Sequence, residues 1–250
     1  MDVIRAEAIT KNYGYAKALD GVSLSVFDGE LFGLIGPDGS GKTSLFRIFT
    51  TLISPDSGRA EVLGLDCTAD YESIRCQVGY MPGRFALYQD LTVDENLRFY
   101  ASLFGGKVSD HYDIIAPIFE QIEPFRTRRA GHLSGGMKQK LALCCALIHR
   151  PRVLFLDEPT TGVDAVSRDE FWNMLAGLRA EGITILVSTP YMDEAVRCDR
   201  VALISEGKIL SIDTPSGILE NNETEVNKPI PKTPGQRMEQ VFIKLMGNGK

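Results

Sequence analysis

The apolar residues of this chain fall into short continuous runs and longer stretches with helical spacing. Short runs bounded by turn residues are typical of buried strands, whereas apolar residues three and four positions apart are typical of amphipathic helices. The segments that predict strands, some of them with polar residues between the apolar ones, are Val3–Ala8, Val22–Val26, Leu31–Ile35, Arg59–Leu63, Val78–Met81, Val153–Leu156, Ile183–Val187 and Val201–Ile204. Strands and helices alternate in the last third, which predicts an α/β fold with a parallel sheet.

Helices are predicted at Lys42–Leu52 and along several later segments. Thr92 and Glu95 fit a capping box, which would start one helix in the middle of the chain. The run Leu141–Ile148 predicts a helix that is buried on nearly all sides. Helical spacing is carried by four further sets: Leu97, Tyr100, Ala101 and Phe104; Ile115, Ile118, Phe119 and Ile122, with Pro117 inside; Phe171, Met174, Leu175 and Leu178; and Met238, Val241, Phe242, Leu245 and Met246.

Composition excludes several classes of protein. A net charge of −6 argues against nucleic-acid binding, because no strongly basic surface is predicted. The longest apolar run, Leu141–Ile148, is far shorter than the roughly 20 residues that span a bilayer. The first residues, Met1–Arg5, lack the features of a signal peptide. We therefore expect a cytoplasmic chain with no direct membrane insertion, which reaches a membrane only through a partner.

Cysteine and histidine spacing does not indicate a metal site. The five cysteines include no C-x-x-C pair, and reduced, mostly buried thiols are expected. The three histidines form no cluster with the spacing of metal ligands.

A phosphate-binding loop is predicted between a strand and a helix. The residues Gly36-Pro37-Asp38-Gly39-Ser40-Gly41-Lys42-Thr43 match the pattern G-x-x-x-x-G-K-[ST] in full. The glycines allow the backbone N–H groups to converge on phosphate oxygens, and the helix N-terminus adds a positive dipole end. Lys42 would bridge the β- and γ-phosphates and Thr43 would ligate Mg²⁺, with Ser44 beside them. ATP and Mg²⁺ are therefore the predicted ligands.

A second strand, Val153–Leu156, ends in two carboxylates. Asp157 would hold Mg²⁺, and Glu158 would polarise the attacking water as the catalytic residue. This arrangement is the Walker B pattern. The pattern is weak evidence by itself and becomes strong evidence after a phosphate loop.

The motif Leu133-Ser134-Gly135-Gly136-Met137-Lys138-Gln139 resembles the LSGG-Q signature of ABC ATPases. The resemblance extends from Tyr13 to about Pro215. It implies a P-loop NTPase with a RecA-like parallel sheet core, an N-terminal antiparallel β subdomain and an inserted α-helical subdomain. We expect a single ABC ATPase domain over residues 1–220, with the helical subdomain at about 88–150, a linker at 221–235 and a short C-terminal helix at 236–250.

The same resemblance implies a dimer. In ABC ATPases, the signature residues, here Ser134, Gly135 and Gly136, face the γ-phosphate held by a second nucleotide-binding domain. Asp164 resembles the D-loop aspartate that reaches across the dimer. Tyr13 resembles the aromatic residue that stacks on adenine, although Tyr15 is an alternative.

Partners and location follow from the resemblance too. The segment Tyr88–Leu97 resembles the region that contacts a coupling helix of a polytopic membrane permease subunit. The stretches Tyr191–Ala195 and Cys198–Arg200 are similar to drug-resistance-type exporter ATPases. The expected location is the inner face of the cell membrane, as a peripheral subunit that forms a homodimer or pairs with a paralogous ABC ATPase.

Two positions depart from the family pattern. Gly83 stands where the Q-loop glutamine is expected, with Gln77 and Gln89 out of register, and Pro190 stands where the switch histidine is expected. Neither residue offers a side-chain hydrogen-bond donor. One hypothesis is an asymmetric heterodimer in which this chain's own site turns over ATP slowly. The alternatives are a working homodimer that relies on Glu158, and a regulatory ATP-binding module outside transport.

Overall fold

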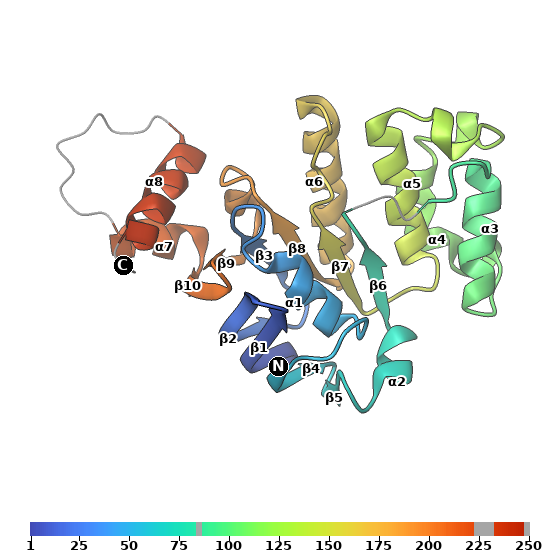
Figure 1. The fold of residues 1–250 in the computed structure, drawn as a ribbon. Coiled ribbons are helices and arrows are strands. Elements are labelled where there is room, and N and C mark those ends of the chain that lie inside the picture. The colour runs from blue at the N-terminus through green and yellow to red at the C-terminus, as the bar shows by residue number, and fades with distance from the viewer. Residues whose placement is uncertain (84–86, 223–232, 248–250) are drawn as a thin grey trace.

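The N-terminal part of the chain forms an antiparallel sheet. The computed structural model describes residues 1–83, 87–222 and 233–247 (Figure 1). Four strands pair in the order β2-β1-β4-β5. Their bounds are β1 Asp2–Tyr13, β2 Ala16–Phe27, β4 Ser57–Val62 and β5 Leu65–Asp66.

A second sheet of six strands forms the centre of the fold, in the order β10-β9-β3-β8-β7-β6. β3 pairs in parallel with β8 and β9, and β7 pairs in parallel with β6 and β8. Because parallel strands share one direction, the carboxyl ends of β3, β7 and β8 meet at one edge. The bounds are β3 Leu31–Ile35, β6 Val78–Met81, β7 Val153–Asp157, β8 Thr184–Thr189, β9 Arg200–Ser205 and β10 Lys208–Asp213.

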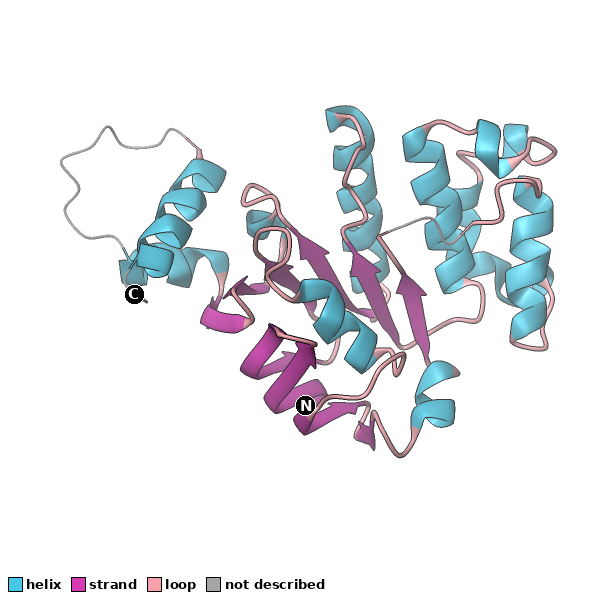
Figure 2. Ribbon diagram, viewed as in Figure 1, coloured by secondary structure: helices cyan, strands magenta, loops and turns pink. Residues whose placement is uncertain are grey.

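Helices cover both faces and both ends of this sheet (Figure 2). α1 lies between the two sheets, where Phe46 and Phe49 contact the ring of Phe155 on β7. In Figure 1, α3, α4 and α5 lie beyond the β6 edge, and α7 and α8 lie at the opposite end near β10. The bounds are α1 Lys42–Phe49, α2 Tyr71–Arg75, α3 Val93–Leu103, α4 Tyr112–Phe119, α5 Gly135–Leu147, α6 Ala165–Ala180, α7 Pro215–Asn222 and α8 Pro234–Gly247.

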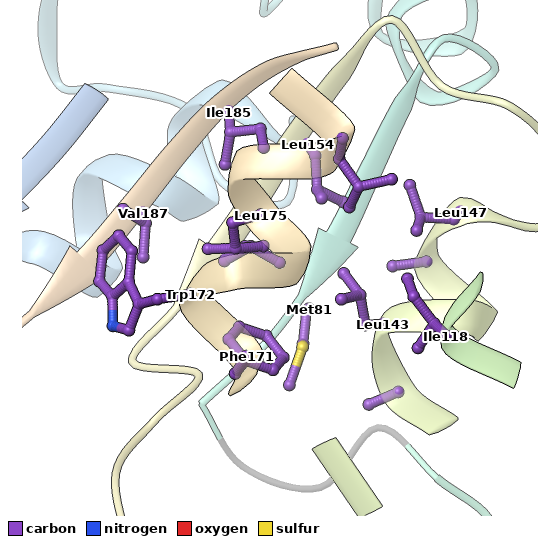
Figure 3. Packing of buried hydrophobic residues seen from close by; sticks show 14 of the residues in the cluster. Met81, Ile118, Leu143, Leu147, Leu154, Phe171, Trp172, Leu175, Ile185 and Val187 are labelled. Carbon is purple, nitrogen blue, oxygen red and sulfur yellow. The ribbon is translucent and has the colours of Figure 1, made fainter. Parts of the chain in front are cut away.

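A large apolar core joins the helices α4, α5 and α6 to the parallel sheet (Figure 3). Phe171 and Leu175 of α6 are buried in this core, which also contains Leu154 of β7 and Ile185 of β8. The stretch Leu141–Ile148 is buried at every position, as predicted. None of the helices in the described residues is long and apolar enough to cross a bilayer.

The structure confirms the predicted P-loop fold and its N-terminal antiparallel sheet, and it corrects several element ends. α1 ends at Phe49 rather than Leu52, where the Thr50 hydroxyl donates to the carbonyl of Phe46. Ile122 lies beyond the end of α4, although it is buried. The capping box of Thr92 and Glu95 is present at the start of α3. The short helices α2 and α7 and the edge strand β10 were not predicted.

The predicted linker at 221–235 falls mostly outside the described residues. Asn221 and Asn222 belong to α7, and Pro234 and Gly235 belong to α8, so both ends of the prediction are wrong. Gly235 packs so closely on Asp193 that a Cβ would stand 2.7 Å from its Cα. All five cysteines are free thiols, and only Cys76 is exposed.

Candidate functional site

The phosphate loop connects the end of β3 to the start of α1, and its backbone passes through tight surroundings. A Cβ at Gly36 would collide with the carbonyl oxygen of Ile204. Gly41 has a φ of +107°, and a Cβ there would collide with the carbonyl oxygen of Ala18. Only glycine fits these two positions, which explains their place in the motif.

Lys42 folds back over this loop. Its Nζ donates to the carbonyl oxygens of Gly36 at 2.8 Å and Pro37 at 2.9 Å. The same Nζ lies 3.2 Å from Oε1 of Glu158, and the Lys42 side chain is only 3% exposed. The two residues come from segments more than 100 positions apart in the sequence, so the pairing is produced by the parallel order of β3, β8 and β7.

Ser188 on β8 organises the two carboxylates at the end of β7. Its hydroxyl donates to Oδ1 of Asp157 at 2.6 Å, and the backbone N–H of Glu158 donates to the Ser188 hydroxyl at 3.0 Å. Asp157 is buried, while Glu158 has a φ of +51°, which is the left-handed region. A non-glycine residue in that region is strained, and such strain is concentrated at functional sites. Burial, with the nearby charge of Asp157, raises the pKa of Tyr80 to about 12.

These residues fit a polyphosphate with a divalent cation. The hydroxyl of Ser40 is buried in the loop and has no hydrogen-bond partner within the described part of the chain. The first N–H groups of α1 have no acceptor inside the helix, so they are available to an anion. No group of three His, Cys, Asp or Glu residues in the described ranges could hold a metal by itself. A cation held by Thr43 and Asp157 would therefore need phosphate oxygens to complete its shell.

Tyr13 lies beside the phosphate loop, whereas the alternative residue, Tyr15, does not contact the loop. The Ser44 hydroxyl donates to the Tyr13 hydroxyl at 3.5 Å, and the Tyr13 side chain remains 45% exposed. Tyr15 projects fully into solvent from the turn between β1 and β2. The position of Tyr13 at the end of β1 is consistent with the predicted adenine contact.

The signature and D-loop residues cap two adjacent helices. Ser134 accepts from the N–H of Met137 at the start of α5. Asp164 accepts from the N–H groups of Val166 and Ser167 at the start of α6. The hydrogen bonds from Ser167 and then Val166 hold the pKa of Asp164 below its usual value. Gly136 packs against Ser167, since a Cβ there would lie 2.7 Å from the Ser167 hydroxyl.

The signature does not meet the phosphate loop within one chain. In Figure 1, α5 lies on the far side of β6 and β7 from α1. The arrangement therefore leaves Ser134, Gly135 and Gly136 apart from Lys42.

Both departures from the family pattern lie at the site. A Cβ on Gly83 would stand 2.9 Å from the carbonyl oxygen of Asp157 and 3.8 Å from Cβ of Glu158. Pro190 follows Thr189, whose carbonyl oxygen accepts from the N–H of Gly36 at 3.2 Å. His149 does not replace the missing histidine, because it stacks on Phe104 and bonds to the carbonyl of Val78.

Sequence reasoning missed Ser188 and the buried Glu194. The role of Ser188 arises from the parallel register of β7 and β8, which pairs it with Asp157 and which no motif indicated. Glu194 accepts hydrogen bonds from Thr160 and Thr189, which no motif indicated.

Comparison with known proteins identifies relatives over nearly the whole chain. A family model described as "ABC transporter" matches residues 19–161. The probable multidrug ABC transporter ATP-binding protein YbhF of Escherichia coli (strain K12) is 39% identical over 246 residues, which cover 98% of this chain. The chain spans only 42% of the length of that relative. The daunorubicin resistance ATP-binding protein DrrA2 of Streptomyces coeruleorubidus is 40% identical over 221 residues, covering 86% of this chain and 68% of that protein.

Solved structures share the fold. A structure described as the ATP binding subunit of an ABC transporter aligns with a TM-score of 0.81 and covers 98% of this chain and 99% of that one. Its sequence identity is 24%, so this likeness concerns the fold alone.

Proposed function

The chain belongs to the ABC transporter family, and we propose that it is the ATP-binding subunit of an exporter. In this proposal it couples ATP binding and hydrolysis at a dimer interface to export by polytopic membrane permease subunits. The names of relatives such as YbhF and DrrA2 support an exporter of the drug-resistance type. The single observation that carries the ATPase assignment is the convergence of Lys42, Asp157 and Glu158 at one edge of the sheet.

Nucleotide binding would change the partners of Lys42. Its Nζ is held by two loop carbonyls and by Glu158, and phosphate oxygens would replace these acceptors. Backbone N–H groups of the loop and of the α1 N-terminus would contact the phosphates, while Tyr13 stacks on adenine. Mg²⁺, held by Thr43 and Asp157, would neutralise charge on the phosphate oxygens.

Release from Lys42 would free Glu158 for catalysis. Its carboxylate would orient a water molecule toward the γ-phosphorus and accept a proton as the bond to the leaving oxygen breaks. Ser188 keeps both the Glu158 backbone and the Asp157 side chain in place. The Glu158 backbone has a positive φ, and its carboxylate lies 3.2 Å from the Lys42 Nζ at the loop.

The separation of the signature from the phosphate loop supports a dimer. Ser134, Gly135 and Gly136 cap α5, whose free N–H groups form a second anion-binding end. Two copies, or this chain and a paralogue, would place each signature against the phosphate loop of the other. The complex would lie on the inner face of the cell membrane.

The replacements Gly83 and Pro190 support an asymmetric pair. Losing one transition-state contact typically lowers turnover about 10²-fold. This chain's own site would then bind ATP and hydrolyse it slowly, while its signature completes a competent site on a paralogous partner. The same replacements favour the second candidate, a regulatory ATP-binding module outside transport.

Turnover by the purified chain tests the assignment. A rate of MgATP hydrolysis that Glu158→Gln abolishes would support an active homodimer and contradict the asymmetric version. A slow wild-type rate that rises in the double variant Gly83→Gln with Pro190→His would support asymmetry. Lys42→Ala should remove ATP binding in either case.

A detergent pull-down with the tagged chain separates the two candidate functions. Recovery of a polytopic membrane subunit supports the transporter, and recovery of a second ATPase supports the heterodimer. A chain that binds MgATP and recovers no membrane subunit would support the regulatory module.

A further inference from the structure

A buried carboxylate lies between the two loops that border the nucleotide site. Glu194 is only 3% exposed, and its two oxygens accept from two different threonine hydroxyls. Oε1 accepts from Thr160 at 2.8 Å, and Oε2 accepts from Thr189 at 2.5 Å. Both threonines are buried. Hydrogen bonds to a charged group in a buried setting are stronger than ordinary ones, so this bridge resists separation.

Each threonine belongs to a different side of the site. Thr189 ends β8, and its carbonyl oxygen accepts from the N–H of Gly36, the first residue of the phosphate loop. Thr160 begins the turn that leads from Glu158 to α6, and its carbonyl oxygen accepts from the N–H of Val163. Asp164 follows and caps α6. A continuous set of hydrogen bonds therefore runs from the phosphate loop through Glu194 to the loop Pro159–Asp164.

The segment after Pro190 is attached to α6 by further contacts. Arg168 of α6 lies over the ring of Tyr191 at 5.0 Å and pairs with Asp193 at 3.7 Å. Arg197 pairs with Asp169 one residue along the same helix. These pairs are exposed and individually weak, so Glu194 is the buried member that fixes the geometry.

We propose that Glu194 is a positioning residue that couples the phosphate-loop side of the site to the loop Pro159–Asp164. The proposal rests on the proposed function, because the loop Pro159–Asp164 would contact a partner chain only in the proposed dimer. Pro190 offers no side-chain donor, and the two sides are linked through Thr189 and Glu194. Occupancy of the chain's own pocket would then be transmitted to the interface even where turnover is slow.

Hydrogen exchange tests the coupling in the full chain. In the wild type, MgATP should slow backbone exchange both in Pro159–Ser167 and in Pro190–Arg197. Thr160→Val keeps the shape of the side chain and removes the donor to Glu194. Because one such hydrogen bond corresponds to about a tenfold change in an equilibrium, we expect the response of Pro159–Ser167 to fall by about tenfold. The response of Pro190–Arg197 should persist.

Thr50→Val is the matched control. Thr50 is also buried, and its hydroxyl donates to a backbone carbonyl at 2.8 Å, but it lies at the end of α1. It should lower the stability of the chain to a similar degree and leave both exchange responses as in the wild type. Glu194→Gln gives a second variant, because an amide has one acceptor oxygen where the carboxylate has two.

The outcomes are distinguishable. If Pro159–Ser167 responds to MgATP in Thr160→Val as strongly as it does in the wild type, the coupling is overturned. Loss of the Pro159–Ser167 response in Thr50→Val would overturn it as well. A wild-type chain that binds MgATP without any response in Pro159–Ser167 would overturn it too. If titration shows no binding of MgATP by the wild type, the proposed function itself fails, and the coupling fails with it.

Discussion

At the scale of single residues, the surroundings of Gly83 leave little space for a side chain. The absence of a glutamine is more than a lost contact, because the backbone at this position already lies against the carbonyl oxygen of Asp157. A side chain there requires the segment or the end of β7 to shift. Gly83→Gln therefore has two opposing effects on the site. It adds a polar side chain, and it displaces the end of β7 that carries Asp157.

We expect Gly83→Ala to lower the free energy of unfolding by about 1–3 kcal/mol, because the added Cβ overpacks a site with no room. Urea unfolding measures the change. Gly177→Ala in α6 is the control, since no atom lies within 4 Å of the Cβ and the backbone is helical. It should raise stability by roughly 0.5–1 kcal/mol. Equal stability of Gly83→Ala and the wild type would show that the segment moves away at little cost.

At the scale of elements, α6 depends on Asp164 at its start. The carboxylate of this residue, the predicted D-loop aspartate, accepts hydrogen bonds from the N–H groups of Val166 and Ser167. A contact across a dimer would therefore compete with the cap of its own helix or share it.

This cap should make stability depend on pH. The folded-state pKa of Asp164 is lowered, so its contribution is present above the unfolded-state pKa and is lost as pH falls through the folded value. Asp164→Asn keeps a capping oxygen without the charge. The thermal midpoint of the wild type should exceed that of Asp164→Asn at about pH 6, and the gap should close toward about pH 3. A gap that is constant with pH would contradict the assignment.

The elements also show what a single sequence can reveal. Short apolar runs identified β3 and β6 to the residue, because both strands are largely buried and follow a turn, although β6 lies at the edge of the sheet. The glycine positions of the phosphate loop could be predicted from spacing alone, since the local backbone geometry requires glycine at Gly36 and Gly41. The edge strand β10 was missed because its half-buried residues include polar ones and give no continuous apolar run. Glu194 and Ser188 were missed because their roles arise from contacts between distant segments.

At the scale of the whole molecule, the proposed dimer would build each nucleotide site from two different chains. Lys42 and Ser134 start two helices that lie apart, so in the proposed dimer a complete site would take Lys42 from one chain and Ser134 from another. Two inactive variants should therefore complement each other. Lys42→Ala and Ser134→Arg, each in the Glu158→Gln background so that ATP persists, should remain monomeric with MgATP when examined alone. Mixed together, they should form heterodimers, because one of the two sites then contains both required residues.

The control for this complementation places both substitutions in one chain. A Lys42→Ala and Ser134→Arg double variant mixed with the Glu158→Gln parent gives heterodimers in which each site lacks one residue, so no pairing through ATP is expected. Pull-down of an untagged chain by a tagged one in MgATP measures both mixtures, with ADP as the reference. Equal recovery from the two mixtures would contradict the head-to-tail arrangement, since it would mean that pairing does not need Lys42 and Ser134 in the same site.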